Sequence, residues 1–92
     1  MILSFKCKDI ERLFNDEFVR KFFSIQRQAR RKLLILESIT KLETLLVPPA
    51  NRLEKLNGSR KDQYSIRVND QWRICFRFYN RNVFDVEIID YH

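Results

Sequence analysis

The sequence predicts an α+β fold: a small antiparallel sheet packed on one face by N-terminal helices. Residues 63–68, 72–79 and 83–91 alternate apolar and polar side chains and are separated by short, turn-rich linkers. Before them lies a long segment whose apolar residues recur at helical spacing. A chain of 92 residues suits one small domain, residues 1–92, with a modest core. We therefore interpret most apolar side chains as structural.

The N-terminal quarter is expected to begin with a strand of the sheet, at residues 2–5, ILSF. Asp9 is a plausible N-cap for a short helix that ends near Asn15, with apolar residues on its buried side. Residues 18–23, FVRKFF, are apolar without a clear period, and we interpret them as a partly helical connection.

The clearest predicted element is a helix from Ser24, as N-cap, to Val47. Its apolar residues recur at steps of three and four, which places them on one face. Pro48 and Pro49 then end the helix, because proline lacks an amide donor and disfavours helix in the residue before it.

The linkers at 69–71 and 80–82 predict two consecutive hairpins. Their register follows from the faces of the strands, since a slip of one residue would expose the apolar set. The apolar face must then receive the long helix. The expected pairs are Val68–Trp72, Ile66–Ile74, Tyr64–Phe76, Tyr79–Val83, Phe78–Phe84, Phe76–Val86 and Ile74–Ile88.

Charge is distributed unevenly along the chain. Eighteen Lys and Arg against 12 Asp and Glu give a net charge of +6, and residues 52–81 alone hold eight basic and three acidic residues. Such a section favours a polyanionic partner, and nucleic acid is favoured over a membrane because no basic amphipathic helix contains the excess. An ordinary solvated basic surface is the alternative. No apolar run approaches the roughly 20 residues of a membrane span.

The residue types that bind metals are few and scattered. Cys7 and Cys75 are far apart, His92 is the one histidine, and the carboxylates lack the spacing of a metal loop. The expected chemistry therefore uses no metal and no cofactor. Met1 leads directly into ILSF without the pattern of a signal peptide, which predicts a cytoplasmic protein with free thiols. Cys75 is interpreted as a small packing residue.

The sheet face turned away from the helix is expected to be charged. The predicted register places Arg67 directly opposite Arg73, with Arg77 on the same face. Two facing arginines are destabilising unless an anion or a carboxylate lies between them. Guanidinium groups at this spacing suit bidentate phosphate binding. The alternative is that Arg77 pairs with Asp85, and the other arginines with carboxylates such as Glu87 or with solvent.

The last strand should bring Tyr91 and His92 beside Arg73. An imidazole, a phenol and phosphate-binding guanidinium groups form a possible site for phosphodiester cleavage. RNA supplies its own nucleophile, the 2′-hydroxyl, so a base, an acid and charge stabilisation suffice. The alternative for His92 is a surface residue without a role.

The sequence as a whole resembles the HigB group of RelE-like toxins, the ribosome-dependent mRNA endonucleases of toxin–antitoxin pairs. The resemblance is in the ILSF start, the PPANRLEKLNGSR loop, the YSIRVNDQWRICF hairpin and the VEIIDYH end. It implies the RelE-like microbial RNase fold and a basic concave face that enters the A site of the 70S ribosome and cuts mRNA there. It also implies a HigA-type helix-turn-helix antitoxin, through which alone the toxin would reach operator DNA.

The resemblance also assigns catalytic roles. It implies a phosphate-stabilising arginine at Arg73 and a substrate-stacking or proton-transferring pair at Tyr91 and His92. Some HigB-like toxins have a histidine at the position of Glu54, whereas related YoeB toxins use a glutamate of this loop as a general base. Glu54 is therefore the candidate base for the 2′-hydroxyl and His92 the acid, or the reverse. The alternative is a solvated glutamate beside Lys55.

Four basic residues are candidate RNA contacts: Arg67, which matches a second family arginine, and Lys55, Arg60 and Arg77. Two other functions stay open at this stage. A binding module could block translation without cutting RNA, and an inactive toxin could act only as a co-repressor with its antitoxin.

Overall fold

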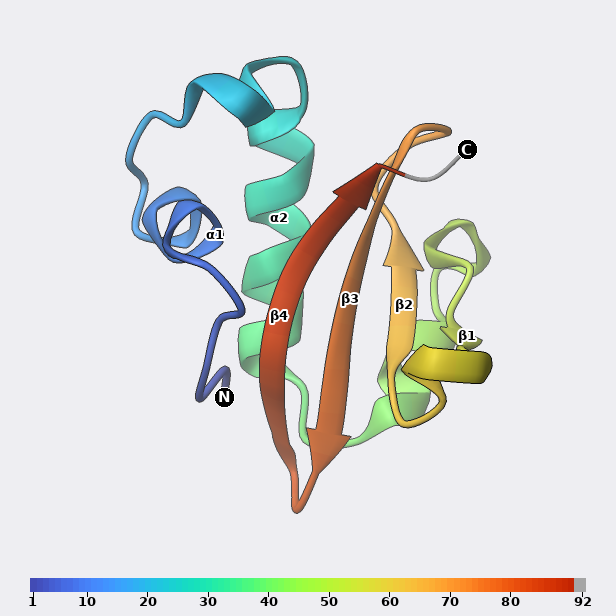
Figure 1. Cartoon of the computed structure of the whole chain (residues 1–92). Coiled ribbons are helices and arrows are strands. Elements are labelled where there is room, and N and C mark those ends of the chain that lie inside the picture. The colour runs from blue at the N-terminus through green and yellow to red at the C-terminus, as the bar shows by residue number, and fades with distance from the viewer. Residues whose placement is uncertain (91–92) are drawn as a thin grey trace.

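A four-stranded antiparallel sheet of order β1-β2-β3-β4 lies at the centre of the computed structural model, which describes residues 1–90 (Figure 1). Its strands are β1 (Glu54–Lys55), β2 (Tyr64–Arg67), β3 (Trp72–Tyr79) and β4 (Asn82–Asp90). Helix α2 (Gln26–Ser38) lies across one face of the sheet, and α1 (Lys8–Phe14) packs beside α2 and β4. The predicted α+β class and the C-terminal meander are confirmed.

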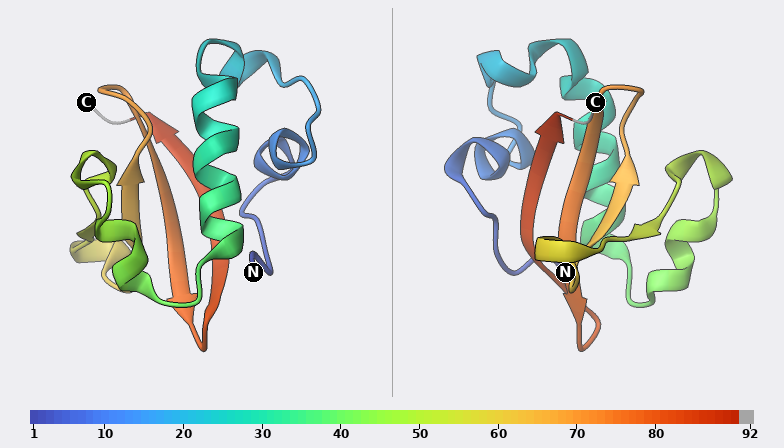
Figure 2. Two further views of the ribbon diagram at one scale, coloured as in Figure 1. Left: turned by 180° about the vertical axis from the view of Figure 1, so that it is seen from behind. Right: turned by 45° about the vertical axis from the view of Figure 1, so that its right-hand side comes forward.

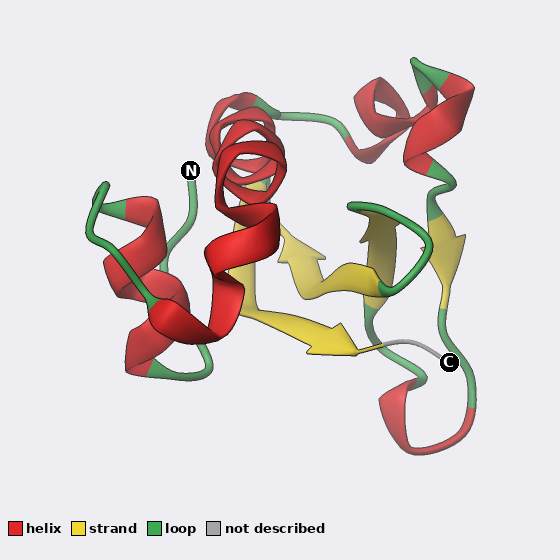
Figure 3. Ribbon diagram, turned by 90° about the horizontal axis from the view of Figure 1, so that it is seen from above, coloured by secondary structure: helices red, strands yellow, loops and turns green. Residues whose placement is uncertain are grey.

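In the described part of the chain, four short 3-10 helices connect these elements. They are η1 (Arg20–Ile25), η2 (Leu42–Leu46), η3 (Pro49–Asn51) and η4 (Gly58–Arg60). The partly helical connection predicted at 18–23 is confirmed by η1, within which Phe22 departs from helical backbone angles. The right-hand view of Figure 2 shows η4 in front of the sheet and α2 behind it, and the view from above in Figure 3 places them on opposite sides of the sheet. One sheet face is therefore covered by helices, and the η4 loop borders the other.

The prediction of a full strand at residues 2–5 is wrong. The segment forms only two isolated parallel bridges to β4, Ile2↔Val83 and Phe5↔Val86. The prediction of Asp9 as N-cap is also wrong, because α1 begins at Lys8 and its N-cap is Cys7. Asp9 instead lies in the first turn, where a negative charge interacts favourably with the helix dipole.

The long helix predicted from Ser24 to Val47 is wrong in extent. Helix α2 ends at Ser38, whose Oγ donates to the Ile35 carbonyl at 2.8 Å, and Ile39 has extended backbone angles. Beyond its end, Ile39 is 2% and Leu45 0% exposed because η2 folds back onto the core, whereas Leu46, which the predicted helix placed on its apolar face, is 57% exposed. The helical spacing of apolar residues in the sequence therefore continues past the end of α2, because α and 3-10 turns repeat at similar intervals.

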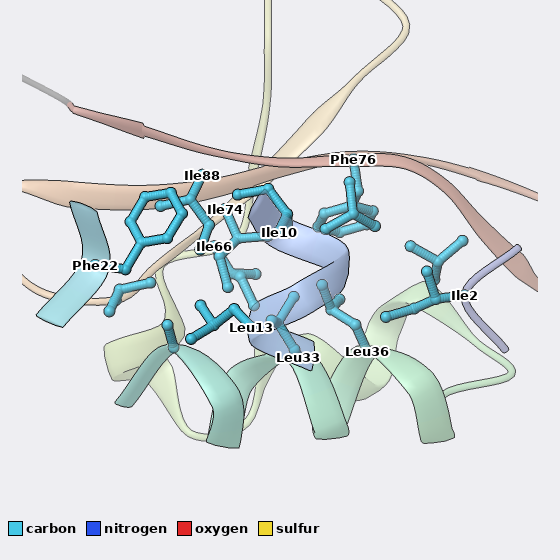
Figure 4. Packing of buried hydrophobic residues seen from close by; sticks show 14 of the residues in the cluster. Ile2, Ile10, Leu13, Phe22, Leu33, Leu36, Ile66, Ile74, Phe76 and Ile88 are labelled. Atoms are coloured by element: carbon cyan, nitrogen blue, oxygen red, sulfur yellow. The ribbon is translucent and has the colours of Figure 1, made fainter. Parts of the chain in front are cut away.

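The core lies between α2 and the sheet (Figure 4). Leu33 and Leu36 of α2 are fully buried against a layer that includes Ile66, Ile74 and Phe76, each of them 0% exposed. Burying each such side chain stabilises the fold by about 1.5–3 kcal/mol. The prediction that the apolar sheet face receives the helix is confirmed.

The register of the first hairpin is confirmed, but that of the second is only partly right. Ile66 faces Ile74 and Tyr64 faces Phe76, while Val68 N donates to Trp72 O at 2.9 Å. The Ile74–Ile88 pair is also confirmed.

A β-bulge then shifts the second hairpin by one residue. Asp85 has a positive φ of 53°, and it stands with Val86 against the single residue Phe76. Phe78 consequently faces Val83 and Tyr79 faces Asn82, so the predicted Phe78–Phe84 and Tyr79–Val83 pairs are wrong. The predicted Phe76–Val86 pair falls at the bulge itself. The extra residue keeps both Val83 and Val86 buried although three positions separate them.

Candidate functional site

Arg73 is the best-anchored charged side chain on the sheet face opposite α2. Strand alternation directs Ile74 and Phe76 into the core and Arg73 to the other face. Its Nε donates to Ser65 Oγ at 3.0 Å, its Nη2 donates to the Arg52 carbonyl at 2.7 Å, and the residue is only 5% exposed. The neighbouring groups therefore hold the guanidinium plane in one orientation.

Glu54 reaches the same guanidinium from β1. Pairing of Glu54 with Ser65 places its carboxylate over β2, and Oε2 lies 3.9 Å from Arg73 Nη2. The Glu54 side chain is 52% exposed, so a molecule in solution can approach the carboxylate directly. The fold thus brings two of the candidate catalytic residues together, a fixed positive charge and an accessible proton acceptor.

Arg67 lies directly opposite Arg73, as the register predicted. Within residues 1–90 each arginine has a carboxylate of its own: Arg67 Nη2 pairs with Asp70 Oδ1, and Arg73 Nη2 lies near Glu54 Oε2. The Asp70 side chain is 99% exposed, and an exposed pair of this kind is weak enough to exchange for another anion.

A cavity of about 170 Å³ opens beside these arginines. Its volume corresponds to several water molecules, at about 30 Å³ each, and accommodates a phosphate group. Among the described residues, three guanidinium groups and one carboxylate line the cavity and make it electropositive, which suits an anion with several acceptor oxygens. The cavity, called the Arg73 pocket below, is lined by Arg52, Arg67, Asn69, Asp70 and Arg73.

A second charged cluster lies further along the same face. Arg60 Nη1 donates to Gln63 Oε1 at 3.1 Å and also to Glu87 Oε1. The hydrogen bond to Glu87 raises the pKa of Arg60 further above its ordinary value, against the opposing effect of burial. The candidate RNA contact Arg60 is therefore an engaged ion-pair partner, and Lys6 Nζ lies 4.0 Å from the same Glu87 oxygen.

Cys75 lies beneath this cluster, opposite Ser65 and Glu87. Its thiol is fully buried, and burial is the main cause that raises its pKa, with a smaller contribution from Glu87 and opposing contributions from Arg60 and Arg73. A protonated, buried thiol is a poor nucleophile. This environment agrees with the interpretation of Cys75 as a packing residue.

Arg77 and Lys55 are not brought into the Arg73 pocket. Arg77 Nε lies 3.2 Å from Asp85 Oδ2, which is the alternative pairing considered from the sequence. Four residues of strand separate it from Arg73, roughly 13 Å at the usual rise per residue. Lys55 is exposed on β1, at the edge of the sheet.

Comparison with known proteins identifies the family. Residues 3–92 match the family described as the RelE-like toxin of the type II toxin–antitoxin system HigB. The chain belongs to the HigB-like toxins. Toxin HigB-1 of Vibrio cholerae serotype O1 is 39% identical over 80 residues, which cover 85% of this chain and 84% of that protein. A protein of Haemophilus influenzae described as uncharacterized is 30% identical over 81 residues, 76% of this chain and 80% of its own length.

Solved structures agree on the fold of the toxin. A crystal structure of a YafQ mutant from Escherichia coli superposes with a TM-score of 0.64 at 12% identity, covering 98% of this chain and 93% of that one. A chain of the YoeB–YefM complex from Staphylococcus aureus gives 0.57 at 17% identity, with coverages of 100% and 98%. The expected RelE-like fold is confirmed, and membership of a type II toxin–antitoxin family implies an antitoxin partner.

The two C-terminal candidates of the toxin, Tyr91 and His92, lie outside the described residues. The last described residue, Asp90, pairs with Trp72, the neighbour of Arg73, and accepts a hydrogen bond from Gln71 Nε2 at 3.2 Å. The end of β4 is thus at the same end of the sheet as the Arg73 pocket.

Sequence reasoning missed two groups that position Arg73 in the toxin. Ser65 is a buried polar residue that the predicted register already placed on the charged face, so its role was available from the sequence. Arg52 contributes a backbone carbonyl and has a left-handed φ of 46°, for which no sequence signal was present.

Neither a metal site nor a membrane span emerges from the described part of the toxin. Among residues 1–90, no group of three or more His, Cys, Asp or Glu is arranged to hold a metal ion. In the same range, no helix combines the length and hydropathy needed to cross a bilayer.

Proposed function

We propose that this toxin is a ribosome-dependent endoribonuclease that cuts mRNA at A-site codons by metal-independent acid–base chemistry. The supporting observation is the approach of Glu54 to Arg73 beside a pocket lined by three arginines. A proton acceptor and a site for a phosphate lie within one small space, as 2′-hydroxyl attack on the adjacent phosphate requires. We treat residues 1–92 as one catalytic domain that works in the cytoplasm, where mRNA is translated.

In this mechanism Glu54 takes the proton from the 2′-hydroxyl. The 2′-oxygen attacks the neighbouring phosphorus, and the bond from phosphorus to the leaving 5′-oxygen breaks. Arg73 balances the charge that develops on the non-bridging oxygens, a role worth roughly 100-fold or more in rate. His92 supplies the proton for the 5′-oxygen, although the roles of Glu54 and His92 could be exchanged.

The anchoring of Arg73 suits this role. A guanidinium held by Ser65 and the Arg52 carbonyl needs no reorganisation when charge develops on the phosphate. Tyr91 would stack on a base of the single-stranded codon, the usual way in which proteins hold splayed RNA bases.

The other basic candidates would bind the RNA backbone around the cleavage point. Arg67 lines the pocket, Arg60 lies on the same face beside Glu87, and Lys55 is exposed at the edge of the sheet. Arg77 would reach RNA only by exchanging its partner Asp85. The ribosome would supply the alignment of the mRNA, which explains a requirement for it. We assign a HigA-type helix-turn-helix antitoxin as the partner, with operator DNA bound through the antitoxin.

Primer extension on a defined mRNA, with and without translating ribosomes, tests the proposal. The wild-type toxin should give ribosome-dependent cuts at A-site codons, and Arg73→Ala, Glu54→Gln and His92→Ala should weaken them. Arg81→Ala is the control, since Arg81 is an exposed base in the β3–β4 turn. Translation arrest with intact mRNA would instead identify a binding inhibitor, and the absence of any arrest would identify a co-repressor.

A further inference from the structure

We propose that a second phosphodiester-binding site lies between α2 and the end of β2, next to the Arg73 pocket. The site is a cavity of about 230 Å³, called the Lys32 pocket below. This inference rests on the proposed function in one respect, that the ligand is RNA. The lining residues are Gln28, Arg31, Lys32, Ala50, Arg67 and Val68.

The charge around this cavity is unbalanced. Arg31, Lys32 and Arg67 supply three cationic groups, and no carboxylate of the described residues lines it. Asp70, the partner of Arg67, lies in the neighbouring pocket and is almost fully exposed. A phosphodiester would offset the mutual repulsion of the three cations and accept hydrogen bonds from all of them.

Lys32 is held at the wall of the cavity rather than extended into solvent. Its Nζ donates to Oδ1 of Asn51, a residue that is only 1% exposed. The amide nitrogen of Asn51 donates in turn to the carbonyls of Leu45 at 3.2 Å and Val47 at 3.4 Å. The orientation of the amide is thus set by η2, so the ammonium group has a defined position on the pocket wall.

The electrostatics of Lys32 agree with this geometry. Its pKa is lowered, first by burial and then by the positive charges of Arg31 and Arg67. The three cations therefore lie close enough together to disfavour one another. A bound anion would return the pKa of Lys32 toward its ordinary value.

Arg67 lines both pockets and so joins them. An RNA strand whose scissile phosphate occupied the Arg73 pocket would pass Arg67 and place a flanking phosphate against Arg31 and Lys32. Only a strand longer than the scissile step would reach both sites. The second pocket would thereby set the direction in which the strand crosses the toxin.

The experiment measures binding without cleavage, by fluorescence anisotropy at low salt. The probes are 2′-O-methylated single-stranded RNAs of three and nine nucleotides, which lack the nucleophile. Lys32→Gln and Arg31→Gln should each lower the affinity for the nine-nucleotide probe roughly fivefold, as expected for the loss of one partly screened ionic contact. The salt dependence of log K should fall by about 0.7 per lost phosphate contact. Binding of the three-nucleotide probe should not change.

Two further variants keep the test specific. Arg27→Gln removes the same charge from an exposed position of α2 that does not line the Lys32 pocket, so its affinity should stay close to wild type. Lys32→Arg keeps the charge and should restore binding. Arg31 is exposed, so Arg31→Gln remains informative if Lys32→Gln lowers the melting temperature by releasing Asn51.

The same variants are then titrated against ribosomes without mRNA, to identify the source of the phosphodiester. If the variants bind the nine-nucleotide probe more weakly than the wild type does, the Lys32 pocket is assigned to the mRNA strand. If only their binding to ribosomes is weaker, the pocket is assigned to ribosomal RNA. If neither variant weakens binding beyond Arg27→Gln in either assay, the inference is overturned. Because no probe is cleaved, this failure is distinct from a failure of the proposed nuclease activity.

Discussion

The carboxylate of Glu54 lies 3.9 Å from the guanidinium of Arg73, although the two residues belong to strands that are not neighbours. Strand β2 lies between them, and its residue Ser65 pairs with Glu54 and accepts a hydrogen bond from Arg73. The two charged groups therefore meet above a small side chain. A bulky side chain such as leucine at position 65 would separate them.

Replacing Arg73 should affect both activity and stability. In Arg73→Gln the rate of mRNA cleavage should fall by roughly 100-fold or more, because the charge that faces the phosphate is lost. Loss of the bonds to Ser65 and the Arg52 carbonyl should also lower the free energy of unfolding by about 1–3 kcal/mol. Primer extension and urea denaturation measure the two effects. Unchanged cleavage in a folded variant would remove Arg73 from the mechanism.

Ser65→Ala should separate positioning from charge. The variant keeps the Arg73 guanidinium but removes its Nε partner, so kcat should fall by roughly tenfold while the KM for programmed ribosomes changes little. Ser65→Thr, which retains a hydroxyl, should recover most of the lost kcat if the strand tolerates the added methyl group. Equal loss of kcat in both variants, with normal melting temperatures, would contradict a role through the hydroxyl.

Cys75 should make stability fall at alkaline pH. Burial raises its pKa above the ordinary thiol value of 9.0, so the folded state retains a proton that the unfolded state releases. The stabilisation is complete below pH 9.0 and is lost as the pH rises through the folded-state pKa. Urea denaturation at pH 8 and pH 10 should show a smaller decrease in the free energy of unfolding for Cys75→Ala than for the wild type.

An alkylation measurement provides the control for this prediction. Cys7 is exposed and Cys75 is buried, so a thiol reagent at pH 8 should modify Cys7 rapidly and Cys75 only after unfolding. Equal rates of modification in the folded toxin would show that Cys75 is accessible, and the pH prediction would then fail with it.

Two adjacent leucines of α2 offer a matched test of the core. Leu33 is fully buried, and Leu33→Ala should lower the free energy of unfolding by about 2–5 kcal/mol. Leu34 is 60% exposed, and Leu34→Ala should change it by about 0.5 kcal/mol or less. Urea denaturation of both variants checks the orientation of the helix on the sheet. Similar losses at the two positions would mean that α2 does not present the Leu33 face to the core.

Much of the fold was predictable because the strands alternate regularly. The Ile66–Ile74 and Tyr64–Phe76 pairs follow from apolar side chains that must share one face. The bulge at Asp85 was not predictable by the same reasoning, because an aspartate with positive φ has no distinct pattern in the sequence. The end of α2 at Ser38 was missed since the apolar residues of η2 continue the helical spacing.

Less of the candidate site could be predicted. The predicted register placed Arg67 opposite Arg73. The approach of Glu54 depends instead on β1, a strand of only two residues in a segment whose composition predicts a loop. The Arg52 carbonyl is a backbone group, and side-chain patterns carry no information about such groups. The Arg77–Asp85 pair was one of the alternatives considered from the sequence. The pairing of Arg67 with the exposed Asp70 was not, because a solvated aspartate in a turn carries no sign of its partner.

Both edges of the sheet offer little free backbone for another strand, for different reasons. On the β4 side, the N-terminal segment donates Leu3 N to Val83 O and Lys6 N to Val86 O, and on the other side β1 is only two residues long. Few unpaired amide and carbonyl groups are thus arrayed for another polypeptide to extend the sheet. A folded copy of the toxin is consequently protected from edge-to-edge aggregation with other copies.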